Sequence, residues 1–222
     1  MISSLNDKFQ QIYCINLDKR TDRWKEANEL FERFSVSVKR VSGIEDDPPW
    51  NGLRLTVIGI FEEAIKNEYS SILIFEDDID WSNNFSERFE QQWENLPEDW
   101  DMFYFSAAHQ LWPQQHNQYF FKLSWSTAAH AIAFKSTCFE SVLESLRKEN
   151  DAIDVIYSRL QKNLNAYCCI NPIAWQRRSF SDIEKEEKWY PYLKDIEFYR
   201  KYMQGLVTID GREVQPPDQG PQ

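Results

Sequence analysis

The feature that most constrains this chain is a short apolar run that ends directly in acidic residues. Residues 71–75 are short, continuous and almost entirely apolar, which is typical of a buried strand in a parallel sheet. Glu76, Asp77 and Asp78 follow this run without a spacer. Because open α/β folds bind ligands at the carboxyl ends of such strands, the sequence predicts three carboxylates at a binding edge of a sheet.

Three carboxylates this close to one another repel unless a cation lies among them. Divalent metals such as Mg²⁺ prefer oxygen ligands of this kind. The pattern is therefore the one expected of a site that holds a metal-bound diphosphate. The alternative is a strand that runs into a solvated acidic loop, which is disfavoured because the acids directly adjoin the apolar run.

Length and charge limit the possible architectures and partners. A chain of 222 residues fits one domain and can bury about 70% of its unfolded surface. We expect this domain to span residues 1–214 and a disordered tail to span residues 215–222, where three prolines and no apolar anchor occur. The formal net charge of −11 argues against nucleic acid as a partner.

Composition also bears on the compartment. No apolar stretch approaches the length of a membrane span, and the first residues lack the basic and apolar regions of a secretory signal. The four cysteines have no CxxC spacing, so we expect reduced and mostly buried thiols. These features together predict a cytoplasmic protein without an integral membrane segment.

Strands and helices alternate along the first half of the chain. We expect strands over residues 11–17, 36–41, 71–75 and 101–106. Helices are expected over residues 21–34, 53–68 and 85–96. Thr21 is expected to cap the first helix, and a loop over residues 46–52 to precede the second. This order predicts an α/β fold with a mostly parallel sheet. Two apolar runs within residues 119–134 are expected as antiparallel additions near the sheet edge, followed by two further helices and a strand over residues 166–170.

A second candidate functional segment, rich in cations, lies at the end of the first predicted strand. Lys19, Arg20 and Arg23 place three cations within five residues of an otherwise acidic chain. They lie at the start of a predicted helix, where backbone N–H groups can face an anion. Cations that are simply paired with neighbouring surface aspartates are an equally good interpretation.

Four stretches of the chain stand in an order found in one enzyme family. They are YCINLDKRTDR at residues 13–23, VSG at 41–43, ILIFEDDI at 72–79, and NPIAWQ at 171–176 with SDI at 181–183. Together they resemble the motifs of glycosyltransferase family 25, which includes lipooligosaccharide galactosyltransferases and collagen hydroxylysine galactosyltransferases. The resemblance covers nearly the whole chain up to residue 183.

The resemblance implies a single-domain GT-A type, Rossmann-like α/β fold and transfer of a galactose-like hexose from a UDP-sugar to a glycan or other hydroxyl acceptor. It implies a divalent metal, Mn²⁺ or Mg²⁺, inversion at the sugar carbon and a role in lipopolysaccharide biosynthesis. Carried onto matching positions, Ile15, Asn16 and Leu17 would line the nucleobase, Arg20 and Arg23 would approach the ribose and phosphates, and Glu76, Asp77 and Asp78 would form the acidic motif, with Asp78 the direct metal ligand.

The chain departs from the family pattern in its histidines. Relatives often carry Gly-x-x-x-Ser-His before the acidic strand, whereas residues 52–57 here end in Val57. Many GT-A enzymes also use a late metal-binding histidine, and no histidine follows His130. Asp182 is the expected substitute ligand, although a helix cap explains it equally well. A nucleotide-sugar or glycan-binding protein without catalysis is therefore the second hypothesis.

An inverting transfer also needs a base that accepts the proton of the attacking hydroxyl. Asp154 matches an aspartate that the family usually has, so we predict it as the base, with Asp151 as the second candidate. The alternative is that both residues stabilise a helix N-terminus. A nucleotidyltransferase or phosphohydrolase is disfavoured, because the chain has neither a P-loop nor enough glycine to build one.

Two further expectations concern substrate contacts. Trp112 and Trp125 are candidates for stacking on an acceptor sugar. Arg177 and Arg178 either close over the diphosphate or lie exposed on the surface. No motif identifies the acceptor or the oligomeric state.

Overall fold

The computed structural model describes residues 5–209 and 211–212. The predicted tail at residues 215–222 and the predicted domain limit at residue 214 lie outside this range. Within the described ranges, no helix is long and apolar enough to cross a membrane.

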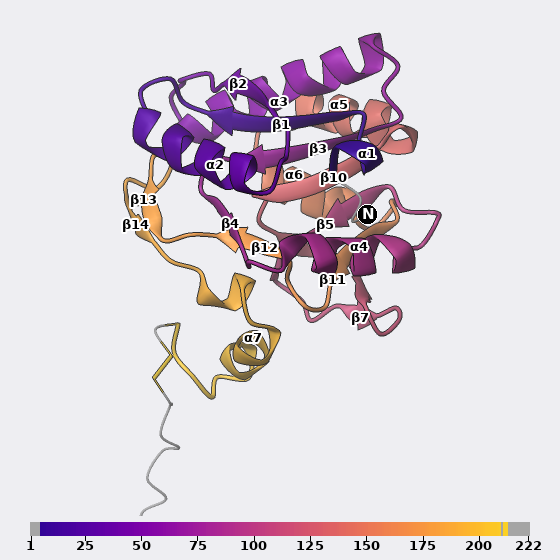
Figure 1. Cartoon of the computed structure of the whole chain (residues 1–222), viewed down its shortest axis with the longest axis vertical. Coiled ribbons are helices and arrows are strands. Elements are labelled where there is room, and N and C mark those ends of the chain that lie inside the picture. Colours follow the sequence, from indigo (N-terminus) through magenta and orange to yellow (C-terminus); the bar gives the residue numbers. More distant parts are fainter. Residues whose placement is uncertain (1–4, 210, 213–222) are drawn as a thin grey trace, which may run out of the picture.

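An eight-stranded mixed sheet runs through the centre of the molecule, in the order β2-β1-β3-β10-β5-β11-β8-β7 (Figure 1). The strands are β1 (Gln11–Asn16), β2 (Lys39–Ser42), β3 (Ser71–Glu76), β5 (Met102–Tyr104), β7 (Gln114–Gln115), β8 (Phe120–Lys122), β10 (Ala131–Lys135) and β11 (Ala166–Cys169). All of them run in one direction except β8 and β10. The expected mostly parallel sheet is therefore confirmed.

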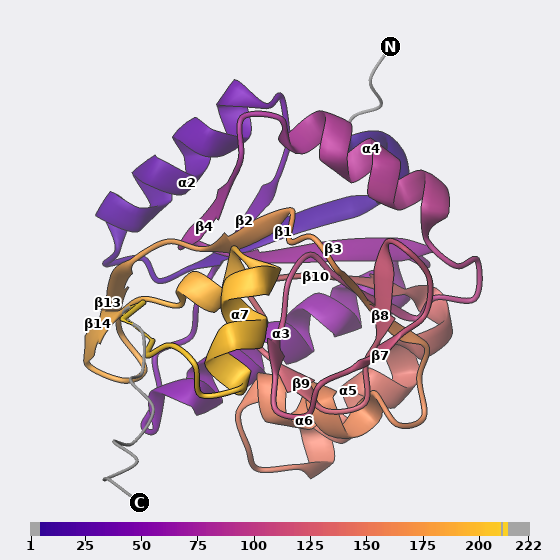
Figure 2. The same cartoon turned by 90° about the horizontal axis from the view of Figure 1, so that it is seen from below.

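Helices cover both faces of this sheet (Figure 2). One face carries α2 (Thr21–Arg33) and α4 (Phe85–Asn95), and the other carries α3 (Pro49–Lys66), α5 (Phe139–Lys148) and α6 (Ile153–Leu160), while the short α1 (Leu5–Lys8) precedes β1. Alternate residues of β3 enter the two apolar cores: Ile72 and Ile74 join one, and Leu73 and Phe75 join the other. Burial from both sides explains the continuous apolar run and confirms the expected α/β layout of a sheet flanked by helices.

The predicted place of the antiparallel additions is wrong for β10. This strand lies in the middle of the sheet, where Ile132 pairs with Ile74 of β3 and with Tyr104 of β5. Residues 131–134 of this five-residue strand are all buried, because helices cover both faces at this point. Their continuous apolar pattern indicates a central strand, although it does not indicate which strands are the neighbours.

One predicted helix cap and one predicted strand start are also wrong. Thr21 is the first residue of α2 and not its cap, because Arg20 takes the N-cap position without a side-chain hydrogen bond. The second strand begins at Lys39 and not at Val36, whose backbone N–H instead donates to Phe31 O at the end of α2.

Helix α3 begins earlier than predicted, at Pro49, within the expected loop 46–52. Proline suits the first helical turn because it has no backbone N–H to leave unpaired. Gly52 lies in this turn, where a Cβ atom would be 2.0 Å from Ile44 O. The close approach therefore requires glycine, and it holds the loop that follows β2 directly against α3.

The last part of the chain returns to the carboxyl ends of β1 and β3 (Figure 1). Strand β12 (Ala174–Gln176) pairs with β4 (Ile79–Trp81), and β13 (Ser179–Ser181) pairs with β14 (Glu186–Lys188) as a hairpin. The short helix η2 (Pro191–Leu193) and α7 (Ile196–Met203) follow. From the middle of the sequence, β6 (Ala108–His109) and β9 (Ser126–Thr127) form a small antiparallel pair, and Tyr199 of α7 donates a hydrogen bond to His109 O of β6.

Arg177 fastens the turn that carries the acidic residues. Its backbone N–H donates to Asp78 O at 2.8 Å, and its guanidinium donates to Asp77 O at 2.7 Å and to Ile79 O at 3.1 Å. The side chain is therefore committed to the turn and does not close over a ligand. The neighbouring Arg178 side chain is 70% exposed, which agrees with the surface alternative.

All four cysteines are free and buried, as expected, and two histidines are buried with them. His109 Nδ1 lies 2.9 Å from Ser126 Oγ, and its ring stacks on Tyr199. His130 Nε2 lies 2.8 Å from Ser106 Oγ. Burial lowers the pKa of each imidazole to about 4, so both are neutral at neutral pH.

We expect His109→Phe to flatten the acid-induced loss of stability. The unfolded chain takes up this proton below about pH 6.5 and the folded protein only below about 4, so stability is full above pH 6.5 and falls as the pH drops through this window. One such group accounts for about 3 kcal/mol over the whole window. Chemical denaturation at several pH values measures the slope. His116→Gln removes an exposed imidazole and should leave the slope unchanged; equal slopes for both variants would contradict the account.

We expect Arg177→Gln to lower the free energy of unfolding by about 3 kcal/mol, because it leaves the carbonyl groups of the acidic turn without a charged donor. Arg178→Gln is the matched control and should change stability by less than about 0.5 kcal/mol, because its ion pair with Glu187 is exposed. Urea denaturation measures both. A loss for Arg177→Gln no larger than the control's would show that the turn does not need this clamp.

Candidate functional site

A cleft of about 450 Å³ opens at the carboxyl ends of β1 and β3. The predicted site residues that line it come from five different segments: Ile15, Asn16, Leu17, Arg23, Glu76, Asp77, Asp78, Asp154 and Asp182. Parallel strands that end at one sheet edge explain how the β1 and β3 residues meet.

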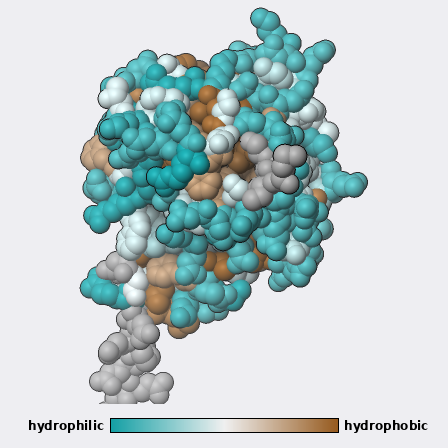
Figure 3. Space-filling model, viewed as in Figure 1, coloured by the Kyte–Doolittle hydropathy of each residue, from teal (hydrophilic) through white to brown (hydrophobic). Residues whose placement is uncertain are grey.

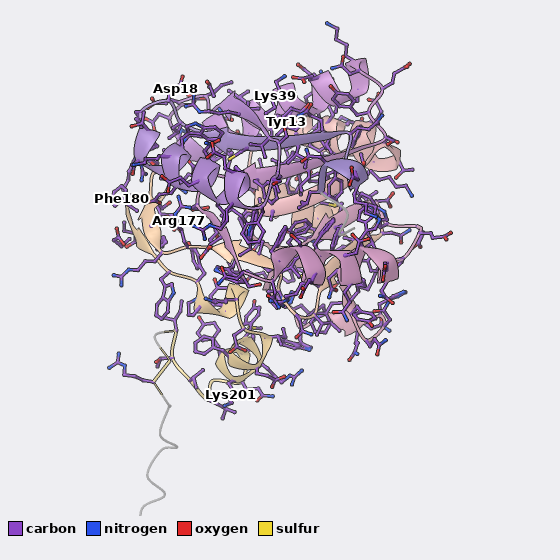
Figure 4. All side chains as sticks on the ribbon, viewed as in Figure 1. Tyr13, Asp18, Lys39, Arg177, Phe180 and Lys201 are labelled. Carbon is purple, nitrogen blue, oxygen red and sulfur yellow. The ribbon has the colours of Figure 1, made fainter. Side chains whose placement is uncertain are left out.

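Two predicted site residues do not line this cleft. Arg20 lies beside it, where its guanidinium pairs with Asp182 and Asp22 and donates to Phe180 O at 3.3 Å. These contacts tie the start of α2 to the β13 strand, and Phe180 and Arg177 appear at the same end of the molecule in Figure 4. Asp151 instead pairs with Arg159 at 2.6 Å.

The acidic residues converge on one guanidinium. Arg23 Nη2 lies 2.7 Å from Asp77 Oδ1 and 2.6 Å from Asp78 Oδ2, and Nη1 lies 3.9 Å from Asp182 Oδ2. The side chains of Arg23, Asp77 and Asp78 are only 11%, 9% and 12% exposed. The cation that the carboxylates require is therefore provided by α2 in this structure.

One carboxylate oxygen of this group has no partner. Asp78 Oδ1 is buried without a hydrogen bond, whereas Asp78 Oδ2 receives the ion pair from Arg23. A free, buried carboxylate oxygen fits a hard divalent cation. Among the described residues, however, no group of three or more Asp, Glu, His or Cys side chains is arranged to hold a metal by itself. A metal at Asp78 would need further oxygens from a bound ligand, as Mg²⁺ sites with substrate phosphates do.

Glu76 differs from its two neighbours in protonation. Burial raises the pKa of Glu76 to about 8, and the charge of Asp78 adds to the increase. Gln176 Nε2 donates to Glu76 Oε2 at 3.2 Å. Glu76 is therefore largely protonated at neutral pH in this arrangement and contributes less negative charge than the sequence suggests.

Asn16 connects β1 to the acidic turn and is completely buried. Its Nδ2 donates to Asp77 Oδ2 at 2.6 Å, and its Oδ1 accepts from Arg40 Nη2 at 2.7 Å and Nε at 2.9 Å. The amide is fully used within the protein, so it positions Asp77. The sequence did not identify Arg40 as a site residue. Arg40 lies in β2 opposite Cys14, two residues before Asn16, so a correct strand register would have placed it near the site.

Asp154 lies in the first turn of α6 at the edge of the cleft. Burial raises the pKa of its carboxyl, and the backbone N–H groups of Val155 and Ala128 partly offset the increase. Ala128 has φ of 72°, a left-handed conformation that non-glycine residues rarely adopt. A partly buried carboxylate of raised basicity, held by backbone donors, has the properties of a proton acceptor.

The C-terminal segment supplies an aromatic wall that the sequence did not indicate. Tyr190 and Tyr192 line the cleft, and Tyr192 stacks on Tyr199 and Tyr202 with ring centroids 4.8 and 5.7 Å apart. Figure 3 shows apolar surface over the same segment, at the lower end of the view. The predicted Trp112 and Trp125 are not among the residues that line the cleft, because both belong to the loops around β6, β7 and β9.

Comparisons with known proteins add only distant likenesses. No family model matches the chain, and no curated protein matches its sequence. Its structure is similar to that of A197 from STIV, with a TM-score of 0.45 and 9% identity over 83% of this chain and 94% of that chain. It is also similar to a glycosyltransferase involved in the glycosylation of the major capsid of PBCV-1, with a TM-score of 0.39 and 12% identity over 63% of this chain and 67% of that chain. Likenesses this distant carry no information about activity.

Proposed function

We propose that this chain is a glycosyltransferase related to family 25, which moves a hexose from a UDP-sugar to a glycan or another hydroxyl acceptor. The observation that carries the proposal is the placement of the buried acidic pair Asp77 and Asp78, with a free oxygen on Asp78, in one cleft with the partly buried carboxylate of Asp154. Such a cleft offers a place for a charged leaving group and a base for an attacking hydroxyl.

The size and several lining residues of the cleft suit a nucleotide donor. Its volume of about 450 Å³ falls within the range of small-molecule sites. Apolar groups of Ile15, Leu17 and Trp50 line one part of it and suit a nucleobase. Lys19 and Arg23 line the same cleft and suit the ribose and phosphates.

We propose Mn²⁺ or Mg²⁺ as the cofactor, held directly by the free oxygen of Asp78. Such an ion, when bound, neutralises charge that develops on a leaving diphosphate. Glu76 and Asp182 are the other predicted ligands. The raised pKa of Glu76 and the ion pair of Asp182 with Arg20 favour supporting roles for these two residues.

The transfer itself needs one proton acceptor and one leaving group. In the proposed reaction the acceptor hydroxyl gives its proton to the carboxylate of Asp154 while its oxygen bonds to the anomeric carbon. The bond from that carbon to the donor phosphate breaks at the same time, and UDP leaves with the electron pair. Attack from the face opposite the leaving group inverts the sugar configuration.

The acceptor side of the cleft supports a carbohydrate. Tyr190 and Tyr192 pack in the same apolar cluster as Ala128, whose backbone N–H faces Asp154. Aromatic faces next to a base suit an acceptor sugar, since a sugar ring has an apolar face that can stack on them. A cytoplasmic location is proposed from the composition of the chain, and a role in lipopolysaccharide biosynthesis from the sequence resemblance alone.

A non-catalytic nucleotide-sugar or glycan-binding protein is the second candidate. Val57, which stands where relatives carry histidine, is fully buried in the apolar core. The described structure therefore offers no imidazole at that position, which favours binding without turnover. Release of UDP from UDP-hexose separates the two candidates, because a binding protein releases none.

We expect Asp78→Asn to reduce UDP release from UDP-hexose with Mn²⁺ by about 100-fold or more, because it removes charge at the proposed metal and diphosphate site. Asp80→Asn is the matched control: this acid lies in the adjacent strand, outside the cleft lining, and the control should stay within about twofold of the parent. A coupled assay for UDP measures both. Unchanged release by Asp78→Asn would refute the assignment of the site.

We expect Asp154→Asn to reduce UDP-hexose hydrolysis, in which water replaces the acceptor, by about 100-fold or more, because the amide accepts no proton. The thermal shift produced by UDP with Mn²⁺ should remain, which distinguishes this variant from Asp78→Asn. Asp151→Asn is the control and should hydrolyse within about twofold of the parent, because Asp151 pairs with Arg159 away from the cleft. Equal losses in both variants would exclude Asp154 as the base.

A further inference from the structure

Arg23 lies between Asp77 and Asp78, next to the position of the proposed metal at Asp78. It reaches them from the first turn of α2, whereas Asp77 and Asp78 come from the turn after β3. One nitrogen, Nη2, contacts both carboxylates, at 2.7 and 2.6 Å. A second cation that binds Asp78 in this arrangement would lie next to a positive guanidinium and be repelled by it.

The three neighbouring cations Lys19, Arg20 and Arg23 have different partners. Lys19 pairs with Glu45, and Arg20 pairs with Asp182 and Asp22. Among these three cations, Arg23 alone bridges Asp77 and Asp78 within the described residues. Its role is therefore separable from that of its neighbours by substitution.

Two buried polar atoms remain without partners in this arrangement. Asp78 is 8% exposed and its Oδ1 has no hydrogen bond, and Arg23 Nε is likewise buried without a partner. An acceptor is thus left for a cation and a donor is left for an anion, on two residues that both line the cleft. A guanidinium forms forked hydrogen bonds with phosphate at least as readily as with carboxylate.

We propose that Arg23 is a positioning residue that competes with the metal for Asp77 and Asp78 until a diphosphate arrives. The diphosphate draws the guanidinium onto its own oxygens, which frees the carboxylates for the metal. Metal and diphosphate therefore bind together, and the metal alone binds weakly. This inference rests on the proposed function, since it takes the diphosphate of a nucleotide-sugar as the ligand.

The proposal has a thermodynamic consequence. If UDP raises the affinity for Mn²⁺ by a given factor, Mn²⁺ raises the affinity for UDP by the same factor, because the coupling is reciprocal. Removal of the competing guanidinium should strengthen binding of Mn²⁺ alone and weaken this coupling. A residue that merely supports the fold would weaken both.

The test titrates Mn²⁺ alone, and then Mn²⁺ with UDP, into the parent protein and into Arg23→Gln, with free Mn²⁺ followed by electron paramagnetic resonance. We expect Arg23→Gln to bind Mn²⁺ alone about tenfold more tightly than the parent, a factor typical of coupled sites. UDP should raise the Mn²⁺ affinity of the parent and have much less effect on the variant. Arg159→Gln also removes a guanidinium that pairs with two carboxylates, Glu149 and Asp151, and should bind Mn²⁺ as the parent does.

Equal or weaker binding of Mn²⁺ alone by Arg23→Gln would overturn the proposal. Arg23→Lys keeps the charge but replaces the planar fork with a single ammonium, so it should bind Mn²⁺ alone more tightly than the parent and more weakly than Arg23→Gln. This variant decides the matter if Arg23→Gln does not fold. If UDP binds no form of the protein, the proposed function fails, whereas the titration with Mn²⁺ alone still tests the competition.

Discussion

The structure depends on the neutralisation of carboxylates at the end of a buried strand. Asp77 and Asp78 lie where the sheet leaves little water, and two adjacent charges there are stable only with a cation between them. Arg23 is that cation, and Asp182 adds a third carboxylate to the same group. Segments that lie far apart in the sequence, α2, the turn after β3 and the β13 hairpin, are therefore joined at the cleft. The partly buried Arg177 side chain also stabilises this turn, through hydrogen bonds to its backbone carbonyl groups.

Much of the fold could be predicted because burial leaves a local pattern. The apolar run before Glu76 indicates a strand covered on both faces, and the alternation of strands with amphipathic helices indicates a parallel α/β sheet. The position of β10 could not be predicted in the same way. Its sequence indicates burial, but its pairing with β3 and β5 depends on contacts between residues far apart in the chain.

The site was predicted at the level of segments and not of contacts. Adjacent acids and a nearby group of cations indicate a charged site, but no local pattern tells which cation meets which acid. Arg23 bridges the acids while Arg20 pairs with Asp182, although both arginines lie in the same turn of the chain. The aromatic wall of Tyr190 and Tyr192 has no periodic sequence pattern, because these residues lie at the start of the three-residue helix η2. This helix follows the β13–β14 hairpin in the chain, and both tyrosines line the cleft.

The internal ion pair also separates folding from metal binding. In a site whose carboxylates have no protein cation, the metal contributes directly to the stability of the fold, as in small zinc domains. Here Arg23 already pairs with both Asp77 and Asp78, so the native arrangement of β3 and α2 has a protein cation at the acidic turn. Under the proposed competition, the affinity for a metal comes mainly from what the ligand contributes, namely phosphate oxygens and an alternative partner for the guanidinium. The proposal therefore predicts that the cleft binds the complete metal and diphosphate unit more tightly than either component alone.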